Sequence, residues 1–136
     1  MPQPEPPMIR VVGVVMRDDA GRILTVRKRG TSRFMLVGGK PEPGETPEAA
    51  AVREAAEEIR AALDPDALSL LGHFRAPAAN EPDHVIESTV FTHPLVAHDE
   101  PAAEIEELRW LDPASPLPGD LAPLLVGYVL PALAAE

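Results

Sequence analysis

The 136-residue sequence contains no cysteine and few aromatic residues: three Phe, one Tyr and one Trp. The absence of cysteine excludes disulfide bonds, thiolate zinc sites and cysteine nucleophiles. With so few aromatic rings, aliphatic residues and alanine must supply most of the core, and tight stacking on a base is not expected. There is no basic-then-apolar leader and no apolar run of membrane-spanning length, so we expect a cytoplasmic protein without a membrane partner.

Positive charge is also scarce. Twelve Lys and Arg residues stand against 22 Asp and Glu residues, which gives a net charge of −10. This balance argues against nucleic acid as a partner, although local cations or a bound metal can still hold a nucleotide. The length suits a single domain, which we expect over residues 8–136. Residues 1–7 carry four prolines and are expected to form a flexible tail.

One stretch, residues 38–61, dominates the sequence: a loop rich in glycine and proline leads directly into a helix. Thr46 can cap this helix, and Pro47 suits its first position. The residues that follow are rich in Ala, Glu and Arg and contain no glycine or proline. We therefore predict a helix from Pro47 to about Leu63.

The chemistry of this helix lies on its polar face. Glu54, Glu57 and Glu58 fall within one turn of each other, opposite an apolar stripe. Three clustered carboxylates repel one another, so a positive group is expected between them. Hard oxygen ligands beside a glycine loop suit Mg²⁺, with Mn²⁺ as a substitute. The alternative is that these glutamates only solvate the outer face of a surface helix.

The rest of the chain alternates strands with turns. The expected strands are 8–16, 22–28, 34–37, 67–75, 84–94 and 104–111. A last helix is expected over Leu121–Ala134, with Asp120 as its favoured cap. A basic loop, residues 28–33, is either a solvated loop or a rim that faces phosphate. Strands before, between and after two helices predict an α/β fold with a mixed sheet between helices.

The spacing of the charged residues in the loop and helix resembles the signature of the Nudix hydrolases, the MutT-like pyrophosphatases. In order, the matching positions are Gly39, five residues, Glu45, seven residues, Arg53-Glu54, two residues and Glu57-Glu58. The resemblance extends over nearly the whole chain from Met8 and implies the α/β/α sandwich of that family. It also implies hydrolysis of the pyrophosphate linkage in nucleoside diphosphate derivatives, including nucleoside triphosphates and ADP-ribose-like compounds, by water that a divalent metal activates.

The resemblance assigns roles to individual residues. The metal ligands it implies are Gly39, Glu54, Glu57, Glu58 and, from a later acidic loop, Glu104. Catalytic roles fall to Arg53, Glu54, Glu58 and Glu104, with either Glu54 or Glu104 taking the proton of water. Expected substrate contacts are Arg27, Phe34, Lys40 and Asp120. Asp120 is the position where similar proteins read a purine edge.

One residue departs from the family pattern, and two others indicate different substrate classes. Arg60 replaces the usual glycine at the helix exit, and because a left-handed conformation costs an arginine about 1 kcal/mol or more, we predict that Arg60 stays helical. Pro77 is a mark of ADP-ribose hydrolases, whereas Asp120 is a mark of triphosphate hydrolases. We therefore expect broad, modest activity on several nucleotides. A non-catalytic nucleotide sensor is the alternative function, and a homodimer is left open.

Overall fold

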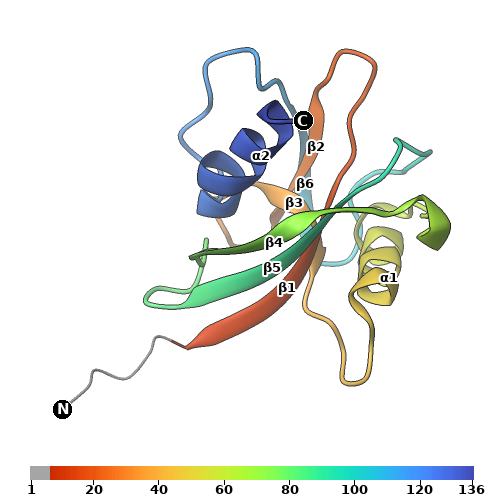
Figure 1. The fold of residues 1–136 in the computed structure, drawn as a ribbon, viewed down its shortest axis with the longest axis horizontal. Coiled ribbons are helices and arrows are strands. Elements are labelled where there is room, and N and C mark those ends of the chain that lie inside the picture. The colour runs from red at the N-terminus through yellow and green to blue at the C-terminus, as the bar shows by residue number, and fades with distance from the viewer. Residues whose placement is uncertain (1–6) are drawn as a thin grey trace.

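The computed structural model describes residues 7–136, and these form one mixed six-stranded sheet with a helix on each face (Figure 1). The strands are β1 (Met8–Val15), β2 (Ile23–Lys28), β3 (Met35–Gly39), β4 (Ser69–Pro77), β5 (Val85–Thr92) and β6 (Ile105–Leu111). Their order in the sheet is β4-β5-β1-β3-β2-β6. Strands β1 and β5 run parallel, and the other neighbours are antiparallel. The α/β/α sandwich expected from the sequence is confirmed.

Helix α1 (Pro47–Ile59) covers one face of the sheet and starts where the sequence predicts. The Thr46 hydroxyl accepts a hydrogen bond from the N–H of Ala49 at 3.1 Å, which satisfies one free donor of the first turn. Small residues on the buried side of α1 let the helix lie close to the sheet. The core on this side contains Ala51, Ala55 and Ile59 of α1, packed on residues that include Val14, Leu24, Val37 and Phe91 of the strands.

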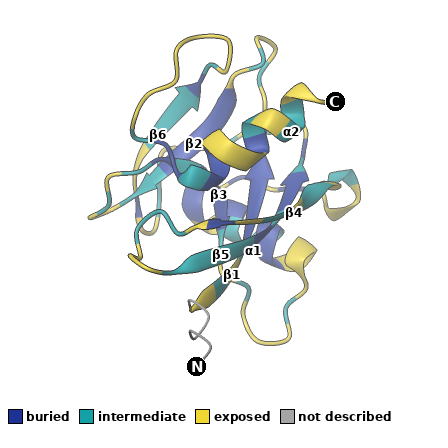
Figure 2. Ribbon diagram, turned by 60° about the vertical axis from the view of Figure 1, so that its left-hand side comes forward, coloured by how far each residue is buried: buried dark blue, intermediate teal, exposed yellow. Residues whose placement is uncertain are grey.

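A second core fills the opposite face, beneath the C-terminal helical segment. This segment comprises a wide-turn π-helix, η2 (Leu125–Val129), followed by α2 (Leu130–Ala134). Its inner side packs on residues that include Val15, Ile23, Leu36 and Val90. Pro131 lacks an N–H and so removes one donor from the ladder, which accounts for the wide turn before it. Figure 2 shows buried residues concentrated in the central strands, with exposed positions on the outer sides of both helices.

The prediction that α1 continues through Arg60 to Leu63 is wrong. The helix ends at Ile59, and Arg60 is left-handed with φ 54° and ψ 38°. Two backbone N–H groups from the 97–104 segment, those of Asp99 and Ala102, donate to the carbonyls of Ile59 and Glu58 at 2.8 Å. The turn at Arg60 also directs the next residues into the core, where Leu63 is buried. These tertiary contacts outweigh the left-handed penalty of about 1 kcal/mol.

The prediction that Asp120 caps a helix starting at Leu121 is also wrong. Leu121 instead forms a parallel bridge with Phe34, and helical structure begins two residues later. The Asp120 carboxylate is used by Arg109, whose guanidinium donates to it at 2.6 and 3.0 Å. Because the Asp120 carboxylate is bound to Arg109 on β6, it does not cap the helix.

The remaining elements lie close to their predicted positions. Strands β4 and β5 begin one or two residues later than expected, and a short 3₁₀ turn, η1 (Pro65–Ala67), precedes β4. Most of the expected tail, residues 1–6, lies outside the described residues, whereas the carbonyl of Pro7 accepts a hydrogen bond from Val85. Within residues 7–136, no helix has both the length and the apolar character needed to cross a membrane.

Candidate active site

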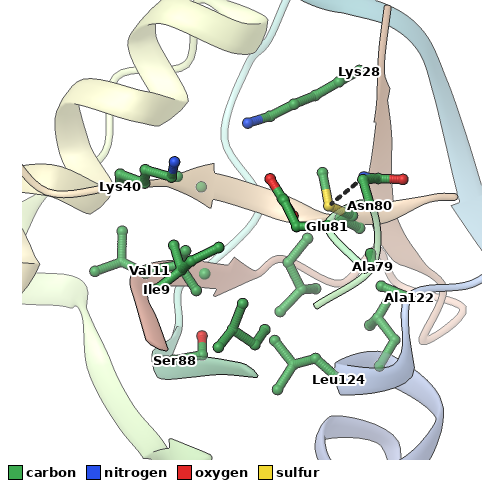
Figure 3. Close-up of a pocket in the computed structure, with 18 of the residues that line it drawn as sticks. Ile9, Val11, Lys28, Lys40, Ala79, Asn80, Glu81, Ser88, Ala122 and Leu124 are labelled. Carbon is green, nitrogen blue, oxygen red and sulfur yellow. Dashed lines mark hydrogen bonds between the residues drawn. The ribbon is translucent and has the colours of Figure 1, made fainter. Parts of the chain in front are cut away.

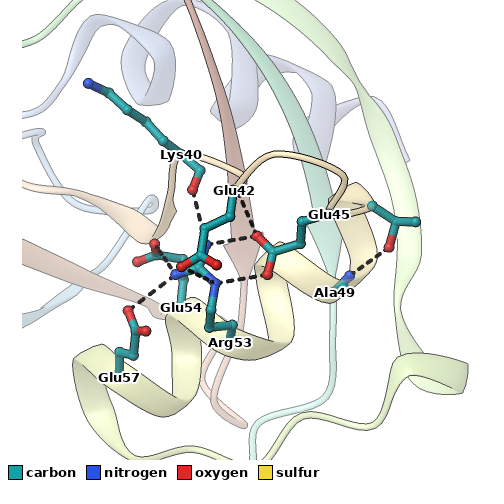
Figure 4. Close-up of polar contacts among 8 residues, drawn as sticks. Lys40, Glu42, Glu45, Ala49, Arg53, Glu54 and Glu57 are labelled. Atoms are coloured by element: carbon teal, nitrogen blue, oxygen red, sulfur yellow. Dashed lines mark hydrogen bonds and ion pairs between the residues drawn. The ribbon is translucent and has the colours of Figure 1, made fainter.

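Arg53 on α1 organises the acidic residues of the glycine-rich loop and helix (Figure 4). Its guanidinium donates twice to Glu45 at 2.8 Å, to Glu54 at 2.9 Å and to Glu57 at 3.2 Å. A further bond at 3.0 Å reaches the carbonyl of Lys40 and ties the loop to the helix. The hydrogen bonds from Arg53 lower the pKa of Glu45 to about 2. Arg53 is therefore the cation that the clustered carboxylates require.

Glu54 lies directly against the backbone at the end of β3. A methyl group on Gly39 would be 2.6–2.8 Å from the carboxyl atoms of Glu54, closer than any packed contact allows. Only glycine at position 39 lets the Glu54 carboxylate keep this position, because the carboxylate occupies the space that a Cβ atom would fill. Desolvation raises the pKa of Glu54, and the hydrogen bond from Arg53 opposes this effect.

Glu58, one helical turn further along α1, is almost fully buried, with 2% of its surface exposed. One of its carboxyl oxygens accepts a hydrogen bond from the N–H of Gly38 at 3.0 Å. Burial raises the pKa of Glu58 to about 8, whereas the Gly38 hydrogen bond lowers it. A buried acid without an ion-pair partner among residues 7–136 is costly, which makes Glu58 a candidate functional group.

Glu104 comes to this region on the segment that meets the end of α1. The carbonyl of Glu104 accepts a hydrogen bond from the N–H of Arg29 at 2.7 Å, and the preceding residue, Ala103, is left-handed. The negative charge of Glu104 is among the causes that raise the pKa of Glu58. The expected fourth acidic group thus lies within electrostatic range of the helix carboxylates, although its own side chain is exposed.

The donor set fits a hard divalent cation. Glu54 lies against Gly39 and Glu58 against Gly38, so two carboxylates of α1 face the same end of β3, and carboxylate and carbonyl oxygens of this kind suit Mg²⁺. In residues 7–136, no three acidic or histidine side chains are already arranged around a single ion position. Figure 4 shows that Glu54 and Glu57 are both bound to Arg53. Metal binding would therefore require Glu57 to exchange its arginine partner for the cation.

A pocket of about 160 Å³ opens on the other side of the Gly38–Gly39 backbone, on the sheet face that α2 covers (Figure 3). Its floor is aliphatic and includes Ile9, Val11, Leu36, Ile86 and Leu124. Polar groups on its border are Lys28, Lys40, Asn80, Glu81 and Ser88. Gly13 and Gly38, which also line the pocket, are register partners on β1 and β3. At both positions the space of a side chain is already taken, by the Leu36 side chain at Gly13 and by the Val12 backbone at Gly38.

Three of the expected substrate contacts are placed elsewhere by the structure. Phe34 is only 3% exposed, with the Arg109 guanidinium 3.6 Å from its ring centroid, so no free ring face remains for a base. Arg27 binds Glu107 and the carbonyl of Thr31. Asp120 pairs with Arg109 and is not among the residues that line the pocket. Lys40, the fourth expected contact, does line it.

Lys28 is the residue that sequence reasoning did not single out. It lies at the end of β2, lines the pocket, and its charge lowers the pKa of both Glu54 and Glu58. The only signal in the sequence was its place in the basic 28–33 segment, which has three Lys and Arg residues: Lys28, Arg29 and Arg33.

Comparison with known proteins agrees with this geometry. The chain is 38% identical over 119 residues to an isopentenyl-diphosphate delta-isomerase from Nocardia farcinica, covering 77% of this chain and 64% of that protein. It is 39% identical over 88 residues to an ADP-ribose pyrophosphatase from Methanocaldococcus jannaschii, covering 62% of this chain and 49% of that protein. The chain thus spans about half to two thirds of the length of these relatives.

Among solved structures, a MutT protein from Methanosarcina mazei superposes with a TM-score of 0.68 at 22% identity, covering 87% of this chain and 90% of the other. This likeness shows a shared fold. The model of the NUDIX domain matches residues 7–129, which include every strand, helix α1 and the pocket. The chain therefore belongs to the Nudix domain family.

Proposed function

We propose that this protein hydrolyses the pyrophosphate linkage of nucleoside diphosphate derivatives, a class that includes nucleoside triphosphates and ADP-ribose-like compounds. The observation that carries the proposal is the placement of Glu54 and Glu58 on the Gly38–Gly39 backbone. That same backbone forms one wall of the pocket. An acidic metal-binding edge and a pocket for an attached group are thereby separated by a single strand.

Lys28 and Lys40 stand between the two regions and supply the positive charge for the diphosphate. Both line the pocket, and Figure 3 shows both in the upper part of the view. In a chain with a net charge of −10, the two lysines outnumber Glu81, the one acidic residue of the described chain that lines the pocket, and so form a local cationic site. Neither lysine forms an ion pair within residues 7–136, so both are free to contact phosphate oxygens.

Glu54, Glu57, Glu58 and the Gly39 carbonyl would hold magnesium, with manganese as a substitute. The ion would neutralise the diphosphate and acidify water in the site. Arg53 orients Glu54 and Glu57 through its hydrogen bonds, and Gly38 orients Glu58 through its N–H. Glu54 is the first candidate to accept the proton of the attacking water, because desolvation raises its pKa; Glu104 is the alternative base.

The identity of the attached group is the least constrained part of this function. Pro77, the residue associated with ADP-ribose hydrolysis, lines the pocket, and one relative is an ADP-ribose pyrophosphatase. Asp120, the residue associated with triphosphate hydrolysis, does not line the pocket. No aromatic side chain lies among the lining residues, which supports modest discrimination between bases. ADP-ribose-like compounds are therefore the first candidates to assay.

The test is a phosphate-release screen of ADP-ribose, dinucleoside polyphosphates and nucleoside triphosphates with Mg²⁺, with and without a chelator. The products are monoesters or pyrophosphate, so phosphate is released by a coupling enzyme: alkaline phosphatase for the first two substrates and inorganic pyrophosphatase for the triphosphates. We expect turnover that requires the cation, is abolished by Glu58→Gln and is kept by Glu48→Gln, an exposed residue of the same helix. Nucleotide binding without any turnover would identify the protein as a sensor and overturn the proposed hydrolysis.

A further inference from the structure

Ser88 on β5 presents a buried hydroxyl at the pocket. The residue is fully buried, its oxygen has no hydrogen-bond partner within residues 7–136, and it lines the pocket. In Figure 3 the hydroxyl points from β5 toward the space beside Val11. Buried polar atoms are nearly always paired, so an unpaired one in a ligand pocket requires an explanation.

The surroundings of Ser88 offer it no structural role. Its neighbours on the same sheet face are Ile86 and Val90, and its register partners are Val11 on β1 and Phe74 on β4, none of which carries a polar side chain. Thr25, the other fully buried hydroxyl residue of the described chain, donates to the carbonyl of Arg109. Ser88 is thus a polar group placed in an aliphatic floor, where alanine would pack equally well.

We infer that Ser88 is a specificity-determining residue that hydrogen-bonds the group attached to the diphosphate. This inference rests on the proposed function for the position of the diphosphate at Lys28 and Lys40. The ligand would carry a nitrogen or oxygen atom at the end remote from its phosphates, as a heterocyclic base does. A hydroxyl both donates and accepts, so it suits several bases and disfavours an attached group that is purely hydrocarbon.

Binding of uncleavable ligands tests this role without requiring turnover. The probes are methylene-bridged analogues of ADP, GDP, CDP and UDP, together with the analogue of isopentenyl diphosphate, whose attached group is a hydrocarbon. Their dissociation constants would be measured by calorimetry with Mg²⁺ for wild type, Ser88→Ala and Thr89→Val. Thr89 is the matched control because it is adjacent on β5, faces the opposite side of the sheet and does not line the pocket.

We expect Ser88→Ala to weaken at least one nucleotide analogue about fivefold to tenfold, the effect of one lost neutral hydrogen bond. Binding of the isopentenyl analogue should stay equal or become tighter, and Thr89→Val should preserve the wild-type order of affinities. The melting temperature of Ser88→Ala should be unchanged or higher, because the hydroxyl has no partner to lose in the free protein.

The inference would be overturned if wild type and Ser88→Ala bound every nucleotide analogue with equal affinity. A lower melting temperature of Ser88→Ala would also overturn it. So would wild-type protein that binds the isopentenyl analogue more tightly than every nucleotide analogue. The proposed hydrolysis is tested by a different result, the turnover in the phosphate-release screen. Ser88-dependent binding without turnover in the phosphate-release screen would remove the hydrolase and keep the specificity residue. Turnover that is the same in wild type and Ser88→Ala, together with equal nucleotide affinities, would remove the specificity residue and keep the hydrolase.

Discussion

The hydrogen bond from the N–H of Gly38 to the carboxyl group of Glu58, at 3.0 Å, joins helix α1 to strand β3 at the wall between the acidic edge and the pocket. It holds a buried acid in one orientation without neutralising it. A rigid ligand costs less conformational entropy when it binds a cation or substrate. The same contact therefore serves both the packing of α1 and the chemistry proposed for its polar face.

Glu58→Gln tests the role of this carboxylate. The amide keeps the shape of the side chain and its acceptor for Gly38, but it cannot lose a proton to become a carboxylate ligand. We expect turnover to fall at least about a hundredfold, together with loss of the stabilisation that Mg²⁺ gives to the free protein. Steady-state kinetics and thermal melts with and without Mg²⁺ measure the two effects. Unchanged turnover would refute the assignment of Glu58 as a ligand.

The adjacent glycines, Gly38 and Gly39, should respond differently to substitution by alanine. A methyl group on Gly38 would lie 2.0 Å from the carbonyl oxygen of Val12, and its φ of 152° is unfavourable for other residues. The Val12 backbone lies in the paired strand β1 and cannot move aside easily, so Gly38→Ala should destabilise the fold by about 3 kcal/mol or more. A methyl group on Gly39 meets only the carboxyl end of Glu54, which can rotate away.

Gly39→Ala should therefore remain folded and lose activity by roughly tenfold to a hundredfold, because Glu54 is displaced from its position. Urea unfolding and kcat measurements on both variants separate the two outcomes. Equal stability losses in the two variants would show that Gly39 is needed for packing rather than for the placement of Glu54.

The start of α1 and its acidic face follow from local sequence. Thr46 and Pro47 form a helix start within two residues, and the spacing of Glu54, Glu57 and Glu58 places them on one side whatever the rest of the chain does. The Nudix pattern also lies within one short stretch. These features could be predicted because no distant residue decides them.

Features that depend on contacts between segments far apart in the sequence could not be predicted from local sequence. The end of α1 is decided by Asp99 and Ala102, some forty residues later. The side chain of Phe34 is covered by Arg109, and the pocket combines Lys28 with Asn80 and Leu124 from three separate elements. None of these pairings leaves a periodic signal in the chain, so the surroundings of Phe34 and the lining of the pocket could not be predicted from it.

The left-handed Arg60 provides a stability test. Because glycine has no Cβ to clash in this conformation, Arg60→Gly should stabilise the protein by about 1 kcal/mol. Arg60→Ala keeps the Cβ and should leave stability nearly unchanged, which separates the backbone effect from loss of the charge. Ala62→Gly, at an exposed position without positive φ, should not stabilise. Equilibrium urea unfolding distinguishes these variants, and a destabilised Arg60→Gly would contradict the strain argument.

The pair Asp120–Arg109 gives a pH-dependent prediction. The hydrogen bonds from Arg109 lower the pKa of Asp120 below its usual value of 3.8. A carboxyl with a lowered pKa in the folded state stabilises the protein above its unfolded pKa, and this contribution is lost as the pH falls through the folded value. Because the Asp120 side chain is 43% exposed, the pair should contribute no more than about 1 kcal/mol.

Asp120→Asn should accordingly destabilise the protein at pH 7, by an amount that shrinks in high salt, and the difference from wild type should fade as the pH falls below 3.8 and through the lowered pKa of Asp120. Asp19→Asn, an exposed acid without an ion-pair partner in residues 7–136, serves as the control and should have no such pH-dependent effect. Urea unfolding at a series of pH values measures both. A destabilisation of Asp120→Asn that persists undiminished in acid would mean that hydrogen bonding by either form, rather than the charge of Asp120, holds Arg109 over the ring of Phe34.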